Sequence, residues 1–133
     1  MNPRPSTRLL FAALGFVMAC AGPLRAPVTG AEGVSGLVTV EPIEGGEQLV
    51  TLSLEALPFP SHRAPALRTY VVWFAEETPR RVGELVYAPE AREGRMHAEH
   101  EGGRFRILIT AERSAEVATP SEYVVVDQWV GEG

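Results

Sequence analysis

Apolar and polar residues alternate with period two along much of the chain, which predicts β-strands that bury one face. The clearest example runs from Val50 to Glu55, where every second residue is apolar. The run from Thr69 to Phe74 is instead apolar on both faces and rich in β-branched and aromatic residues, as expected for a central strand covered on each side. Seven strands are predicted in all, over 37–40, 50–55, 69–74, 82–88, 95–100, 105–110 and 123–126.

Residues that break regular structure separate these runs. Glu44-Gly45-Gly46 and Gly102-Gly103 are typical of tight turns, and Pro58 and Pro60 force an irregular crossing because proline donates no backbone hydrogen bond. The chain after residue 20 contains no convincing amphipathic helix pattern. The sequence therefore predicts an all-β fold, an antiparallel immunoglobulin-like β-sandwich of about seven strands over residues 36–130.

The first part of the chain has a different pattern. Arg4 and Arg8 precede an uncharged apolar run from Leu9 to Ala19, and small residues follow. This order of charged, apolar and small residues is typical of an export signal. The run has eleven residues, whereas a membrane-spanning helix needs about 20. We therefore predict a signal helix over residues 1–19 that is cleaved on export.

The end of that run resembles the signal of bacterial lipoproteins. Their motif is a branched apolar residue, two small or apolar residues and a cysteine, which here are Val17, Met18, Ala19 and Cys20. The resemblance implies cleavage between Ala19 and Cys20, a covalent lipid on Cys20 and no other cofactor. An alanine directly after the cysteine, here Ala21, resembles the sequence of lipoproteins that reach the outer membrane. The alternative is an ordinary signal cleaved after Ala19 or Ala21, and the protein is exported in either case.

Residues 20–35 are rich in glycine, proline and small residues and show no apolar period. Such a composition is typical of a flexible linker, so we predict a tether over 20–35 that carries the lipid at Cys20. A fully extended chain of this length spans on the order of 50 Å. Cys20 is the only cysteine, so no disulfide is expected in the domain that follows.

Charge narrows the choice of partners. All twelve basic residues are arginine, and from residue 20 onward ten arginines face seventeen acidic residues, a formal charge of −7. A negative domain is a poor partner for nucleic acid or for a bare anionic lipid surface. The expected contacts are the membrane, through the lipid anchor, and a protein or glycan of the cell envelope.

A set of segments resembles an exported bacterial β-sandwich domain. These segments are Thr69-Tyr70-Val71-Val72-Trp73, Val82-Gly83-Glu84-Leu85, Phe105 to Glu112 and Thr119-Pro120-Ser121. The domain occurs in envelope lipoproteins and beside peptidoglycan-binding modules of the outer-membrane protein A type, and it is more remotely similar to the extracytoplasmic domain of anti-sigma-K factors. The chain lacks the zinc-type module and the spanning helix of those factors. The resemblance implies no catalytic residues.

Three histidines are the only candidates for site chemistry. His62, His97 and His100, with Glu99, offer a ligand set suited to zinc or copper. Residues three apart on a strand point to opposite faces, so His97 and His100 converge only if the hairpin bends; otherwise they mark a polar hairpin edge. Ser61 lies in no nucleophile motif. We therefore expect a non-enzymatic envelope protein, with a periplasmic metal-binding domain as the alternative.

Overall fold

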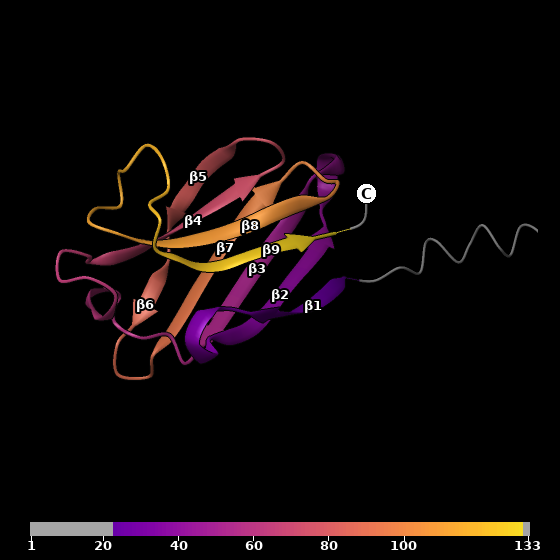
Figure 1. The fold of residues 1–133 in the computed structure, drawn as a ribbon. Helices are drawn as coiled ribbons and strands as arrows, with labels where there is room; N and C mark the ends of the chain where they lie inside the picture. The colour runs from indigo at the N-terminus through magenta and orange to yellow at the C-terminus, as the bar shows by residue number, and fades with distance from the viewer. Residues whose placement is uncertain (1–22, 132–133) are drawn as a thin grey trace, which may run out of the picture.

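Two antiparallel sheets make up the part of the chain that the structure, a computed structural model, describes, which is residues 23–131 (Figure 1). One sheet has the order β1-β2-β3-β7-β6 and the other β5-β4-β8-β9. The prediction of an all-β fold is confirmed. The strands are β1 (Leu24–Thr29), β2 (Ser35–Pro42), β3 (Gln48–Glu55), β4 (Thr69–Ala75), β5 (Pro79–Glu84), β6 (Val86–Ala88), β7 (Glu93–His100), β8 (Phe105–Glu112) and β9 (Val124–Val130). Three short 3-10 helices connect them, η1 (Ala31–Gly33), η2 (Glu44–Gly46) and η3 (Pro60–His62).

The inner faces of the two sheets form one apolar core. On β3, Val50, Leu52 and Leu54 are fully buried, while Thr51 and Glu55 are exposed. The alternation along β3 is therefore the one that the sequence predicts. Phe105 on β8 is also fully buried and belongs to the same cluster, so residues of both sheets interdigitate.

Strand β4 is buried on both faces, as its apolar run predicts. Tyr70 and Phe74 point into the main core. Val71 and Trp73 lie on the opposite face of the sheet, where they form a second small cluster with Leu108. Val117, from the connection between β8 and β9, packs against this cluster. The connection between β8 and β9 thus packs on this small cluster of the outer face.

The predicted tether over 20–35 is wrong for most of its length. Residues Leu24–Thr29 form β1, which pairs along its whole length with β2, and Val28 is 2% exposed. Because β1 is at the edge of its sheet, Pro27 can occupy it without breaking the sheet. The domain therefore includes residue 24, not only residues from 36 onward. Residues 1–22, with the predicted signal and Cys20, lie outside the described residues.

The single strand predicted over 82–88 is in fact parts of two strands in different sheets. β5 ends at Glu84 and pairs with β4, whereas β6 begins at Val86 and pairs with β7. Between them Leu85 is buried, and its N–H donates to the carbonyl oxygen of Tyr70 at 2.9 Å. The chain thus crosses between sheets at one buried leucine. With β1, this crossing raises the predicted seven strands to nine among residues 23–131.

Candidate functional site

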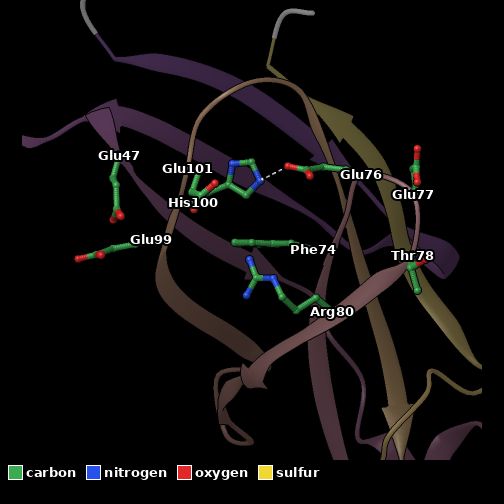
Figure 2. Close-up of a pocket in the computed structure, with 9 residues that line it drawn as sticks. All are labelled: Glu47, Phe74, Glu76, Glu77, Thr78, Arg80, Glu99, His100 and Glu101. Carbon is green, nitrogen blue, oxygen red and sulfur yellow. Dashed lines mark hydrogen bonds and ion pairs between the residues drawn. The ribbon is translucent and has the colours of Figure 1, made fainter. Parts of the chain in front are cut away.

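A cavity of about 890 Å³ lies between β7, the β4–β5 hairpin and the segment just before β3 (Figure 2). Phe74 and His100 lie at its centre, with carboxylates on both sides of them. Its lining residues are Glu47, Phe74, Glu76, Glu77, Thr78, Arg80, Glu99, His100 and Glu101. We call it the acidic cavity, since it presents five glutamates and one arginine.

The acidic cavity lies where the two sheets have free edges. β6 has three residues and pairs with β7 only along Glu93–Arg95. In the described part of the chain, Met96–His100 has a strand partner on its β3 side and none on its other side. β5 is the edge strand of the second sheet. The cavity therefore opens between two strand edges.

His100 is the most deeply buried polar side chain of the cavity, at 5% exposed. Its ring stacks on Phe105, with centroids 4.1 Å apart, and meets the edge of Phe74. The N–H of Gly102 donates to Nδ1 at 3.2 Å, and Nε2 lies 3.1 Å from Oε2 of Glu76. Because Nδ1 accepts, the ring proton is on Nε2 and is donated to Glu76. His100 thus ties the β7–β8 hairpin to the β4–β5 turn.

Negative charge is concentrated enough in the cavity to raise the pKa of one of its carboxyls. The pKa of Glu47 is raised above its ordinary value, chiefly because its carboxyl shares a hydrogen bond with Glu99, and further by the charges of Glu99 and Glu101 and by partial loss of water. A raised carboxyl pKa means that the folded protein holds this proton more tightly than the unfolded chain does. The repulsion therefore destabilises the fold at neutral pH and is relieved as pH falls.

Replacing Glu99 with glutamine is expected to lower the pKa of Glu47, because the substitution removes the charge that opposes its ionisation. A carbon-detected NMR titration of the side-chain carboxyls measures it. Glu55→Gln, at an exposed position at the end of β3, is the control and leaves the titration of Glu47 unchanged. An unchanged Glu47 titration in Glu99→Gln would show that the two carboxyls are not coupled.

The structure does not bring the three predicted histidines together. His97 is exposed on β7, whereas His100 is buried, because the strand stays regular and residues three apart point to opposite faces. His62 is on η3, where its Nε2 lies 3.7 Å from Oε1 of Glu32 beside a separate hollow of about 210 Å³. Within residues 23–131, no three histidine, cysteine, aspartate or glutamate side chains are grouped to hold a metal ion. The ligand set His62, His97 and His100 is therefore not assembled.

Sequence reasoning did not find the acidic cavity. Its signal is present in the sequence, since Glu76-Glu77 and Glu101 lie between predicted strands and Glu47 directly follows the turn Glu44-Gly45-Gly46. Only the pairing of the strands brings these turns to the same end of the molecule. Ala19 and Cys20, the predicted cleavage and lipidation residues, lie outside the described residues.

Comparison with protein-family models, with curated proteins and with solved structures found no match. Among residues 23–131, no helix has the length and apolar character needed to cross a membrane.

Proposed function

We propose that this protein is a non-enzymatic, exported lipoprotein of the bacterial cell envelope, whose β-sandwich serves as a binding or supporting module. The observation that carries the proposal is the sequence Val17-Met18-Ala19-Cys20 at the end of an apolar run that follows two arginines. Lipid on Cys20 anchors the domain to the envelope. The membrane is proposed to be the outer membrane, because Ala21 is a neutral residue directly after the cysteine, as in lipoproteins that reach the outer membrane. Two or more acyl chains give a firm anchor, since each buried methylene contributes about 0.8 kcal/mol.

The nature of the domain agrees with an exported module. Residues 23–131 contain no cysteine, so the fold needs neither a disulfide nor a reducing compartment. The core is continuous across both sheets, and the acidic cavity lies at an open edge. The metal-binding alternative is not favoured, because its three histidines are dispersed.

An immunoglobulin-like topology is part of the proposal, and the strand order supports it. Immunoglobulin-type sandwiches have the order A-B-E-D in one sheet and C-F-G in the other, extended in some members by a strand C′ beside C. If β2, β3, β7 and β6 correspond to A, B, E and D, then β5-β4-β8-β9 corresponds to C′-C-F-G. β1 is then an addition outside strand A. Trp73 departs from the pattern of antibody domains, because it lies on the outer face of its sheet.

Replacing Cys20 with serine is expected to abolish membrane fractionation, because serine cannot receive the thioether-linked lipid. The measurement is the distribution of the full chain between membrane pellet and soluble extract, with mass spectrometry of the N-terminal peptide. Met18→Leu is the matched control, since it keeps the motif and is expected to leave the protein in the pellet. A Cys20→Ser protein that still sediments with membranes and resists salt washing would refute the lipid anchor.

A further inference from the structure

The free side of β7 is an unpaired strand edge long enough to accept a partner. Five residues, Met96–His100, pair with β3 on one side only, and on the other side the pairing with β6 stops at Arg95. An unpaired edge exposes backbone donors and acceptors that a further strand can satisfy. Edge strands are commonly protected by proline, a bulge or charged side chains. Met96–His100 is regular and contains no proline, and its protection is the negative charge of Glu99, which does not repel a basic partner.

The acidic cavity lies directly beside this edge, so a strand added there would point alternate side chains into it. His100 belongs to both the edge and the cavity. Arg80 on β5, which pairs with Phe74 on β4, lines the wall of the cavity that faces β7. Five carboxylates against one guanidinium leave an excess of negative charge. The cavity volume of about 890 Å³ is ample for long side chains.

We propose that an extended peptide segment with arginine or lysine at alternate positions adds to β7 along Met96–His100, in line with β6, and places its basic side chains in the acidic cavity. The free edge calls for an extended backbone, and the charge of the cavity selects its side chains. Arg80 opposes these side chains and limits affinity. This inference deepens the proposed function by giving the partner's chemistry and rests on its binding role, but it does not depend on the lipid anchor.

A second copy of the chain is a poorer occupant of this edge. If two copies paired through β7, each would bring Glu99, along with the charge of Glu47 and Glu101, to the same interface. Like charges placed opposite one another on neighbouring strands are destabilising. A basic segment meets no such repulsion.

The test uses fluorescence anisotropy with the full chain in detergent and a labelled seven-residue peptide, Thr-Val-Arg-Val-Arg-Val-Thr. A twin with glutamate in place of both arginines is expected to bind at least about tenfold more weakly. Two further twins carry N-methyl groups on one or the other set of alternate amides. Because a strand pairs through one edge, one of these twins is expected to lose binding while the other retains it.

Charge variants of the protein locate the site. Glu77→Gln combined with Glu101→Gln removes one carboxylate from each wall and is expected to weaken binding by about fivefold to tenfold. Glu55→Gln combined with Glu90→Gln makes the same change of net charge at exposed positions outside the cavity and is expected to change it less than about twofold. Circular dichroism establishes that both variants are folded.

Arg80 gives a prediction of opposite sign. Arg80→Gln removes the cation that lines the cavity and is expected to tighten binding by about twofold to fivefold, whereas Arg81→Gln, on the other face of β5, has little effect. Equal binding of the arginine and glutamate peptides, equal binding of both N-methylated twins, or a dimer that excludes the peptide would each overturn the proposal. Any of these results leaves the membrane-fractionation test of the anchor unaffected.

Discussion

Replacing Trp73 with alanine is expected to lower the free energy of unfolding by about 3 to 5 kcal/mol, the usual cost of removing a large buried aromatic side chain. Trp73 is fully buried against Val71 and Leu108 on the outer face of its sheet. Its indole N–H donates to the hydroxyl of Thr110 at 2.9 Å, and that hydroxyl donates to Oε2 of Glu112 at 2.6 Å. Truncation would therefore leave both a cavity and a disturbed polar network.

The carboxylate at the end of this network extends the effect of Trp73 to the β8–β9 connection. Glu112 is 4% exposed, and its Oε2 also accepts the N–H of Ser121 at 2.8 Å. Ser121 in turn donates through its hydroxyl to the carbonyl oxygen of Ala111. Because buried polar groups of this kind stabilise only when all are satisfied, loss of the indole is expected to loosen the connection as well as the sheet.

The chain contains a matched control for this substitution, since it has two tryptophans. Trp129 on β9 is 45% exposed and packs against the guanidinium of Arg104, whose Cζ lies 4.4 Å from the ring centroid. Trp129→Ala is expected to cost only about 0.5 to 1 kcal/mol, the worth of an exposed cation–π contact. Urea unfolding followed by far-UV circular dichroism measures both. Equal losses in the two variants would contradict the assignment of Trp73 to a second core.

Stability is expected to fall by about 2 kcal/mol between pH 10 and pH 12 as Tyr70 ionises. Burial is the main cause that raises the pKa of Tyr70 from 10.0 to about 12. The folded protein therefore resists the loss of this proton more than the unfolded chain does. The resulting stability is fully present below pH 10 and is lost as pH rises through about 12.

The structural role of Tyr70 explains why the neutral phenol is needed. Its hydroxyl donates to the carbonyl oxygen of Pro58 at 2.6 Å, and Tyr87 donates in the same way to Leu57 at 2.7 Å. The two phenols thus hold the proline-rich crossing between the sheets. A phenolate has no proton to donate and would face a carbonyl oxygen across a buried contact, so ionisation breaks the contact.

The absence of lysine simplifies the interpretation of this pH dependence, because no lysine titrates in the same range. Within residues 23–131, tyrosines are the only side chains that titrate between pH 9 and pH 12, since all the basic residues there other than histidine are arginine. Tyr70→Phe is expected to lose about 1 kcal/mol at pH 8 with the hydrogen bond, and to flatten most of the decline above pH 10. Urea unfolding at pH 8, 10, 11 and 12 tests this. An equally steep decline in Tyr70→Phe would assign the alkaline sensitivity to another group.

Residues with strong periodic patterns were predicted well because each local pattern agrees with the place of the strand in the sheet. The alternation from Val50 to Glu55 and the two-sided apolar run from Thr69 to Phe74 correspond to β3 and β4. By contrast, Leu24–Thr29 has no alternation and contains a proline, so its composition indicated a linker. Pairing with β2 overrides that composition, since an edge strand tolerates proline on its free side.

The acidic cavity could not have been predicted from single segments. Glu47, Glu76 and Glu101 lie far apart in the sequence, each in or beside a turn, where a glutamate usually means no more than a solvated surface. They meet because the start of β3 and the ends of β4 and β7 lie on the same side of the sandwich. His100 was considered as a metal ligand on its residue type, whereas its partners are Glu76, Phe105 and the backbone of Gly102.

The sequence by itself determined the all-β class, the inward face of the clearest strand and the two-sided burial of β4, because these follow from the period of apolar residues along the chain. It also contains the export and lipidation pattern that ends at Cys20, which remains a prediction. Only the tertiary structure decided that Leu24–Thr29 is a strand, that the chain changes sheets at Leu85, and that five glutamates share one cavity beside a free edge. Those features depend on pairing between distant segments, and no local period encodes it.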